Sequence, residues 1–265
     1  IVVMVMGEDY DMSGEAASRT NIKLPGNQTK FIKRIREAVP NKKIVLVLMN
    51  GRPLDLSEED TLADAVLETW FPGTMGGNGV ADVLFGKHNP SGKLTVTFPR
   101  NLGQIPIYYN MKNTGRPISA SNPHEDYKSH YLDSPNTPLY VFGHGLSYTT
   151  FEYSNFTLST PTIKFSDTLT ASATITNTGN YDGYEVVQLY VHDKVGSVTR
   201  PVKELKGFDK IFLKKGESKT VSFDLTVEDL KFWNSEMEFT VEPGEFEIAI
   251  KGTSDFDFEH VFTLE

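Results

Sequence analysis

Residues 1–6 have the sequence IVVMVM, and residues 44–49 have the sequence IVLVLM. Neither run alternates between apolar and polar side chains, so each predicts a strand that is buried on both faces. A third, shorter run is AVLETW at 65–70. Strands buried on both faces are typical of parallel sheets, because crossover helices cover the two sides. The three runs therefore predict a parallel α/β sheet.

Two helical patterns accompany these strands. Residues 28–39, QTKFIKRIREAV, place apolar side chains at helical spacing opposite lysine and arginine, which predicts an amphipathic crossover helix. Residues 76–86, GGNGVADVLFG, predict a second helix that stops at its last glycine. The segment 89–99, NPSGKLTVTFP, predicts a turn and one more strand.

The pattern changes from residue 153 onward. Short alternating strands recur at intervals of about 8 to 12 residues, which predicts an antiparallel β-sandwich of immunoglobulin or fibronectin type III kind. The chain has no cysteine, so the disulfide that joins the sheets of antibody domains is excluded. The segments expected to carry strands are 169–179, 184–193, 203–217, 219–229, 238–252 and 260–265.

The expected fold class is thus α/β followed by all-β, in three parts. Residues 1–108 form a parallel α/β region, 109–152 a long linker, and 153–265 the β-sandwich. The segment 109–138 is rich in Asn, Pro, Ser and Tyr and is too long for a simple connector. We expect it either to pack over another domain or a dimer partner and shape the outer part of a site, or to be a plain strap between domains.

Composition limits the partners of this chain. Its net charge of −9 and its pI of about 5.2 argue against a nucleic-acid surface, because phosphate binding needs clustered basic residues. No stretch is long and apolar enough to cross a membrane. The chain begins inside an apolar run, without Met or a signal peptide. We therefore expect it to be the later part of a longer polypeptide.

The loop that follows the first strand holds four acids, Glu8, Asp9, Asp11 and Glu15. In open parallel sheets ligands bind beyond the carboxyl ends of the strands, so this loop is the strongest candidate for a site. A desolvated carboxyl there would have a raised pKa, as a general acid requires. For Glu8, Asp9 and Asp11 we favour the alternative, in which the side chains are solvated or cap backbone amides.

Other chemistries have less support. The acids do not have the spacing of an EF-hand loop, and the six histidines do not have zinc-protease spacing, so no metal site is expected. The glycine-rich segment 70–79, WFPGTMGGNG, lacks the Lys-Ser/Thr pair of a phosphate loop. Trp70 and Phe71 could line a sugar site, although packing in the core is the favoured interpretation. No cofactor is implied.

Five segments stand in a fixed order along the chain: 13–25 (SGEAASRTNIKLP), 45–54 (VLVLMNGRPL), 63–110 (ADAVLETWFPG to IPIYYN), 138–154 (PLYVFGHGLSYTTFEYS) and 200–218 (RPVKELKGFDKIFLKKGES). In this order they resemble glycoside hydrolase family 3, and most of all its periplasmic β-glucosidase type. Together they cover nearly the whole chain. The resemblance implies a (β/α)8 barrel first, then a parallel α/β sandwich domain, then a fibronectin type III-like domain. This chain matches the second and third, and the barrel is missing.

The resemblance also implies a mechanism. The family hydrolyses β-glycosides with retention, using an Asp nucleophile in the barrel and, in this branch, a Glu acid/base on a loop of the sandwich domain. By its place in the SGE motif the acid/base is Glu15. Glu8 is the competing residue, and we expect it to cap or brace the loop. Arg19 is a candidate substrate-binding residue, but pairing with one of the acids is favoured.

The implied function is hydrolysis of terminal β-linked glucosyl residues, with β-linked oligosaccharides or aryl and alkyl β-glucosides as substrates. Two alternatives stay open: a β-xylosidase of the same fold, and a noncatalytic carbohydrate-binding or interaction module. The implied partner is the barrel, and a homodimer is one further option, whereas nucleic acid and membranes are not expected. The implied location is periplasmic or secreted. Without the barrel, these residues should have no glycosidase activity.

Overall fold

The computed structural model describes residues 1–117 and 125–265. Part of the predicted 109–138 segment, including His124, therefore lies outside the described residues. The chain divides into two compact units: 1–88, 96–107 and 133–140 make up the first, and 89–95, 108–132 and 141–265 the second. The boundaries predicted at 108 and 153 stay predictions.

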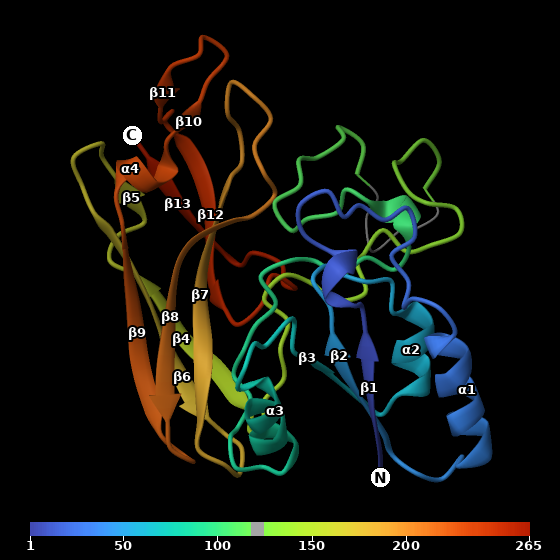
Figure 1. Cartoon of the computed structure of the whole chain (residues 1–265). Coiled ribbons are helices and arrows are strands. Elements are labelled where there is room, and N and C mark those ends of the chain that lie inside the picture. The colour runs from blue at the N-terminus through green and yellow to red at the C-terminus, as the bar shows by residue number, and fades with distance from the viewer. Residues whose placement is uncertain (118–124) are drawn as a thin grey trace. The chain divides into compact units, whose positions relative to one another are not determined.

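The first unit contains a parallel sheet, as the apolar runs predict. Its strands are β1 (Val2–Gly7), β2 (Ile44–Met49) and β3 (Ala65–Glu68), in the order β1-β2-β3 (Figure 1). β1 pairs with β2, and β2 with β3, in parallel register. Because the pairing is parallel, the carboxyl ends of all three strands lie at one edge of the sheet. The central strand β2 has the most buried side chains of the three. The prediction that residues 1–6 are buried on both faces is wrong, because β1 is an edge strand and leaves Val3 and Val5 exposed.

Three α-helices belong to this unit. α1 (Gln28–Ala38) and α3 (Gly76–Leu84) confirm the two predicted helices. α2 (Ser57–Leu62) was not predicted; it is a short helix whose first turn is acidic, which suits the positive end of the helix dipole. The remaining helical turns are the 3-10 helices η1 (Tyr10–Met12) and η2 (Leu102–Gln104).

The strand predicted within 89–99 is wrong. Over this segment the structure has one isolated bridge, between Phe98 and Tyr140. Phe98 N donates to Tyr140 O at 2.9 Å, but the chain bends at 95–96, so a ladder cannot extend along it. The next residue, Pro99, has no N–H to donate. The alternation of apolar and polar side chains in this segment therefore does not indicate a strand.

The second unit contains the predicted β-sandwich (Figure 1). One sheet has the order β4-β6-β9 and the other β5-β13-β12-β7-β8; all pairs are antiparallel except β5 with β13. A separate hairpin pairs β10 with β11. The bounds are β4 Phe151–Leu158, β5 Thr162–Ile163, β6 Leu169–Asn177, β7 Gly183–Asp193, β8 Glu204–Leu213, β9 Ser218–Leu225, β10 Phe232–Trp233, β11 Phe239–Thr240, β12 Gly244–Lys251 and β13 His260–Leu264.

Several details of the sandwich differ from the prediction. β4, β5 and β10 are missing from the expected strands, and the pairing of β4 with β6 is interrupted by a bulge between Ser154 and Thr157. The expected segment 238–252 splits into β11 and β12 around Pro243. The end of the segment 219–229 forms a short helix, α4 (Val227–Leu230), and Thr226 and Asp229 cap its N-terminus with a capping box.

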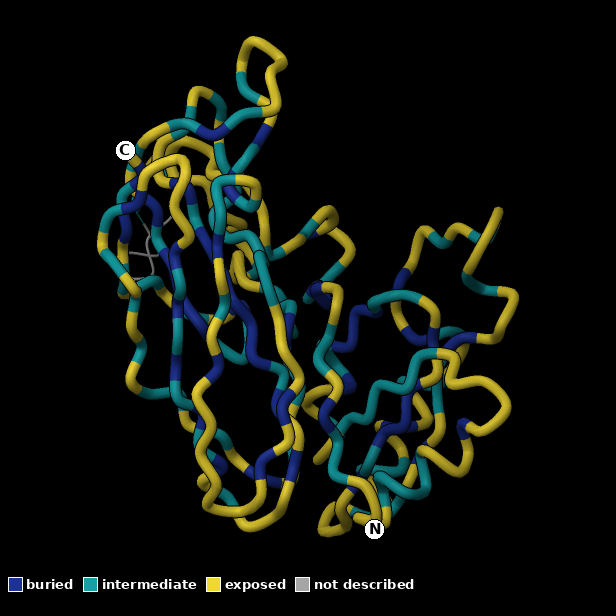
Figure 2. The backbone as a smooth tube through the Cα atoms, turned by 90° about the vertical axis from the view of Figure 1, so that its left-hand side faces the viewer, coloured by how far each residue is buried: buried dark blue, intermediate teal, exposed yellow. Residues whose placement is uncertain are grey.

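The core of the sandwich lies between its two sheets. Every second residue of β6 is buried, as expected for a strand with one face on a core. Figure 2 shows buried stretches, in dark blue, along the strands of the sandwich. Facing β6 are buried residues of β7 and β12, among them Val187, Phe246 and Ile248. The fold class predicted from the sequence is therefore confirmed. Within the described ranges no helix has the length and apolar character needed to cross a membrane.

Candidate functional site

Polar side chains collect where the three parallel strands end. Glu8 follows β1, Asn50 and Arg52 follow β2, and Glu68 is the last residue of β3. All of them belong to the first unit. Because ligands bind beyond the carboxyl ends of parallel strands, this edge is the candidate site.

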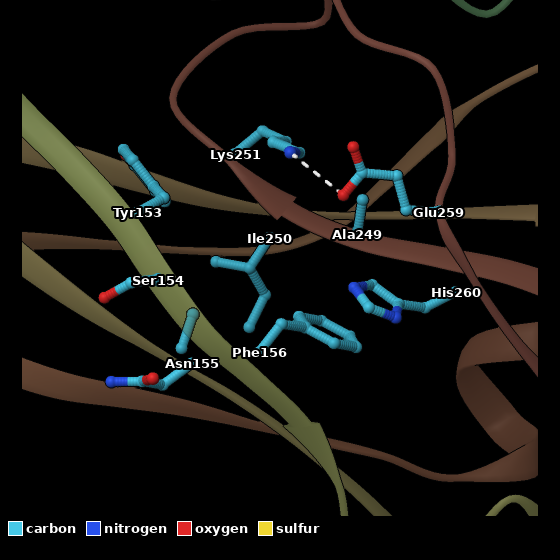
Figure 3. Close-up of a pocket in the computed structure, with 10 residues that line it drawn as sticks. Tyr153, Ser154, Asn155, Phe156, Ala249, Ile250, Lys251, Glu259 and His260 are labelled. Atoms are coloured by element: carbon cyan, nitrogen blue, oxygen red, sulfur yellow. Dashed lines mark ion pairs between the residues drawn. The ribbon is translucent and has the colours of Figure 1, made fainter.

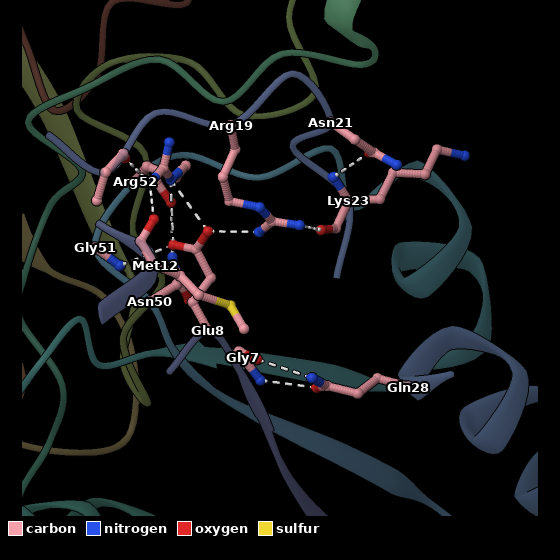
Figure 4. A network of polar contacts seen from close by, with 11 residues as sticks. Gly7, Glu8, Met12, Arg19, Asn21, Lys23, Gln28, Asn50, Gly51 and Arg52 are labelled. Carbon is pink, nitrogen blue, oxygen red and sulfur yellow. Dashed lines mark hydrogen bonds and ion pairs between the residues drawn. The ribbon is translucent and has the colours of Figure 1, made fainter. Parts of the chain in front are cut away.

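Glu8 is a buried brace at this edge. Its side chain is fully shielded from solvent, with the Arg19 Nη1 atom at 2.6 Å and the Arg52 Nε atom at 3.1 Å from its carboxylate (Figure 4). Its own N–H donates to Met49 O at 2.9 Å. A carboxylate between two guanidinium groups is neutralised where it is buried. The structure thus gives Glu8 the bracing role, and the alternative of a solvated loop charge is wrong for it.

Arg52 connects the strand edge to the loop. Its Nη2 atom donates to Met12 O and, at 3.0 Å, to Ala17 O, while its Nε atom faces Glu8 (Figure 4). The two carbonyls flank the segment 13–16, so one guanidinium holds both ends of the turn that carries Glu15. Arg52 was not among the residues predicted from the sequence, although it lies shortly after a buried strand.

Glu15 lies exposed on that turn. It stands between Gly14, with φ 109°, and Ala16, with φ 59°, and Ala17 N donates to Gly14 O at 3.3 Å. Among the described residues Glu15 has no ion-pair or hydrogen-bond partner. Its carboxyl is thus open to solvent on a turn whose ends are held. The catalytic role of Glu15 stays a prediction.

Arg19 takes part in the bracing. Besides its ion pair with Glu8, its Nη2 atom donates to Lys23 O at 3.2 Å. Its side chain is 19% exposed, so the guanidinium is mostly enclosed. This is the pairing that the sequence analysis favoured; a contact with a sugar hydroxyl stays a prediction.

The two remaining acids of the loop are exposed. Asp9 accepts a hydrogen bond from Tyr10 N at 2.7 Å and is the N-cap of η1. Asp11 lies in the first turn of that 3-10 helix. Asp9 is thus an amide cap and Asp11 a solvated charge, in line with the interpretation favoured from the sequence.

Glu68 is a largely buried acid that the sequence analysis missed. Burial raises its pKa from 4.5 to about 7, although Trp70 N and Asn50 Nδ2 donate to its carboxylate at 2.8 and 3.2 Å. Asn50 is fully buried, and its Nδ2 atom also donates to Arg52 O at 2.8 Å. Asn50 directly follows β2 and Glu68 is the last residue of the neighbouring strand β3, and this position at the carboxyl ends of the strands is the signal that could have identified them.

The aromatic pair after β3 is divided between two environments. Trp70, at φ 51°, packs its ring 5.8 Å from that of Phe98, which is the core role favoured for it. Phe71 is 43% exposed. It reaches Gly51, where a Cβ would lie 2.8 Å from the Phe71 ring and 2.0 Å from Ser13 Oγ. Only glycine fits between these two side chains.

The second unit offers a pocket of about 230 Å³ at the edge of the sandwich (Figure 3). The Phe156 and His260 rings stack there at 4.0 Å, and Lys251 pairs with Glu259 at 3.9 Å. Glu259 is the one carboxylate that lines it, whereas glycoside hydrolysis uses two. Across residues 1–117 and 125–265 no three His, Asp or Glu side chains are grouped to hold a metal ion.

Comparisons with known proteins cover both units. Residues 1–148 match the family model described as glycosyl hydrolase family 3 C-terminal domain. Residues 185–254 match the fibronectin type III-like domain. These matches confirm the resemblance indicated by the five sequence segments.

Individual proteins agree with the family models. The chain is 55% identical to the periplasmic beta-glucosidase of Salmonella typhimurium over 94% of its own length and 32% of that protein. It is 42% identical to a beta-xylosidase of Formosa agariphila over 97% of its length and 34% of that protein. The crystal structure of a beta-glucosidase from Listeria innocua in complex with glucose superposes with a TM-score of 0.95 at 43% identity, covering 99% of this chain and 36% of that one. The chain thus spans about a third of the length of each.

Proposed function

Because this chain belongs to glycoside hydrolase family 3, we propose that it supplies the general acid/base of a retaining β-glucosidase. The relatives are about three times as long, so the activity is proposed for this chain together with a (β/α)8 barrel that holds an Asp nucleophile. That arrangement is what the family resemblance implies. Without such a barrel, the chain would have no glycosidase activity.

The observation that carries the proposal is the contrast between two glutamates of one loop. Glu8 is buried and held by two arginines, whereas Glu15 is exposed on the SGE turn. A general acid/base must first protonate the departing oxygen and then activate water, so its carboxyl has to reach the substrate. In a retaining enzyme it lies about 5 to 5.5 Å from the nucleophile, on the far side of the anomeric carbon. Glu15 is free to take that role and Glu8 is not.

The proposed substrates are β-linked oligosaccharides and aryl or alkyl β-glucosides, cleaved at the terminal β-linked glucosyl residue. The Salmonella relative, which is 55% identical to this chain, is named a beta-glucosidase, and this supports glucose over other sugars. A β-xylosidase is the second candidate, because a relative at 42% identity carries that name. Comparing kcat/KM for nitrophenyl β-glucoside and β-xyloside decides between them.

Arg19 is the proposed substrate-binding residue on this chain. A guanidinium has five N–H donors, and the contacts of Arg19 to Glu8 and Lys23 use its two terminal nitrogens. The remaining donors could reach a sugar hydroxyl. If they do, Arg19→Lys should raise KM more than it lowers kcat.

The proposed location is the periplasm or the outside of the cell, since the Salmonella relative is named periplasmic. The proposed partner is the barrel, in the same polypeptide or as a separate chain, and a homodimer is a further option. The segment 109–138 is proposed to shape the outer part of the site. Deleting 113–130 and finding unchanged kinetics and oligomeric state would remove that idea.

The test combines this chain with a family 3 barrel and measures hydrolysis of aryl β-glucosides. Glu15→Ala should abolish most activity on an alkyl glucoside, and azide should restore turnover on an activated aryl glucoside by forming the β-glucosyl azide. The control is Asp11→Ala, which removes a solvated acid of the same loop. Full activity of Glu15→Ala on the alkyl glucoside would remove Glu15 from the mechanism.

The same assay tests the noncatalytic alternative. If the combined chains bind a β-glucan but hydrolyse no glucoside, a binding module is the better description. The sandwich alone should then retain that binding.

A further inference from the structure

We propose that Arg52 is a positioning residue that fixes the turn carrying Glu15, an inference that rests on the acid/base role proposed for Glu15. Arg52 contacts the turn on both sides of Glu15, through Met12 O and Ala17 O, and its other face meets Glu8. It does not touch the carboxyl that it positions. Its effect is transmitted through the backbone of residues 12–17.

The geometry requires a forked donor. A single Nη2 atom reaches two carbonyls while Nε points at the Glu8 carboxylate, and the rigid guanidinium plane fixes the angle between these contacts. A lysine ammonium is a point charge on a flexible stem and cannot hold the three acceptors in one arrangement. Arg52→Lys should therefore keep the charge and lose the positioning.

Arg52 is itself held by residues at the carboxyl ends of β1 and β2. Its backbone carbonyl accepts from the fully buried Asn50 side chain at 2.8 Å, and Asn50 directly follows the central strand β2. Its guanidinium is paired with Glu8, which directly follows β1. Both anchors belong to the carboxyl ends of paired strands, so the position of the turn is tied to the sheet.

The backbone at Glu15 shows why the turn needs holding. Ala16 is in the left-handed region at φ 59°, a conformation that is unfavourable for residues other than glycine. One 3.3 Å hydrogen bond, from Ala17 N to Gly14 O, closes the turn internally. Such a conformation persists where the surroundings fix it. The two carbonyl contacts of Arg52 supply that restraint.

Loss of Arg52 should therefore leave the acid/base present but misplaced. A displacement of about 1 Å can lower the rate about 100-fold, so Arg52→Lys and Arg52→Ala should lower kcat on an alkyl β-glucoside by about 10- to 100-fold, with a smaller change in KM. A dinitrophenyl glucoside needs little protonation of its leaving group, so its kcat/KM should fall less than about threefold. Azide should not restore turnover, because the Glu15 carboxylate is still present. The matched control is Arg34→Lys, an exposed arginine on α1.

Two results of this assay would overturn the inference. Equal losses on both substrates would mean that Arg52 contributes to sugar binding or only to folding. Unchanged kinetics in Arg52→Lys, beside a Glu15→Ala variant that is inactive and rescued by azide, would remove the positioning role and leave the proposed function intact.

A second measurement uses this chain alone. A glutamate-specific protease should cut after Glu15 at least about ten times faster in Arg52→Lys than in the parent, because hydrogen bonds from a charged donor no longer restrain the turn. Arg34→Lys should cut at the parent rate. Equal cutting rates in all three proteins would contradict the restraint of the turn by Arg52. If Glu15→Ala keeps full activity, the proposed function fails, while faster cutting of Arg52→Lys still supports this restraint.

Discussion

The β-sandwich and the parallel sheet are built from similar apolar residues but protect them differently. In the sandwich two sheets face each other, and side chains such as Phe246 and Ile175 are almost fully shielded. In the parallel sheet the edge strand β1 leaves Val3 and Val5 49% and 61% exposed, while four of the six residues of β2 are buried. The first unit carries instead the buried polar contacts of Glu8 and Arg52. The sandwich is thus held mainly by packing, and the candidate site mainly by paired charges.

This contrast can be measured because each unit has one tryptophan, Trp70 in the first and Trp233 in the second. In Trp70→Phe and Trp233→Phe backgrounds, fluorescence during denaturant unfolding follows one unit at a time. Each substitution below should shift the transition of its own unit.

The largest effect is expected in the sandwich core. Phe246 is 1% exposed and stacks on Phe262 at 5.2 Å, so Phe246→Ala should lower the free energy of unfolding by about 3 to 5 kcal/mol. The matched control is Phe208→Ala, since Phe208 is 69% exposed on β8, and it should cost less than about 1 kcal/mol. Equal costs would mean that packing between the sheets does not set the stability of this unit.

The next effect tests the charged brace. Glu8→Gln leaves Arg19 and Arg52 without their shared carboxylate and should lower the stability of the first unit by about 3 kcal/mol. Asp11→Asn removes an exposed charge nearby and should change it by less than about 0.5 kcal/mol. The Trp70 signal should report the loss and the Trp233 signal should not. A shift of both transitions would show that the brace is not local to the site.

A pH dependence should separate the units as well. Burial raises the pKa of Glu68 to about 7, so the folded state binds this proton more tightly than the unfolded state, whose pKa is near 4.5. The stabilisation is complete below pH 4.5 and is lost as the pH rises through about 7. Relative to Glu68→Gln, the first unit should lose on the order of 2 kcal/mol across that window, allowing for partial exposure.

The sandwich provides the comparison for this pH effect. Its buried Glu185 accepts from the Tyr153 hydroxyl at 2.8 Å and pairs with Lys93 at 3.4 Å, so its charge has a cationic partner. Glu68 receives neutral donors only. A parent protein whose stability relative to Glu68→Gln is flat between pH 4.5 and 7 would mean that the Glu68 carboxyl is hydrated in solution.

The sequence predicted the two kinds of sheet more reliably than their irregular parts. The continuous apolar run of β2 and the alternation of β6 each match one burial environment, so both strands could be recognised. Apolar and polar residues alternate in the segment 89–99 as well, but this segment makes a single bridge, between Phe98 and Tyr140. Whether an alternating segment pairs with another strand depends on which segments the fold brings beside it, and the alternation itself does not contain that information. β4 carries a bulge that breaks its alternation.

The site was predictable in the same limited sense. The loop after β1 follows from the geometry of parallel sheets, and Glu15 was selected by resemblance. The contact of Arg52 with Ala17 O joins residues 35 positions apart along the chain, and the contact of Asn50 with Glu68 joins residues 18 positions apart. Such contacts are tertiary, and no local pattern in the sequence contains them.

The smallest expected effect tests the exposed face of β1. Val5 and Val47 are register partners on neighbouring strands, yet Val5 is 61% exposed and Val47 is 1% exposed. Val47→Thr buries an unpaired hydroxyl and should cost about 1 to 3 kcal/mol, whereas Val5→Thr should change stability by less than about 0.5 kcal/mol. Both are read from Trp70 at two protein concentrations. If Val5→Thr costs as much as Val47→Thr, the face of β1 is covered in solution; a cost that grows with concentration would identify a second copy as the cover, and a constant cost would point to a contact within the chain.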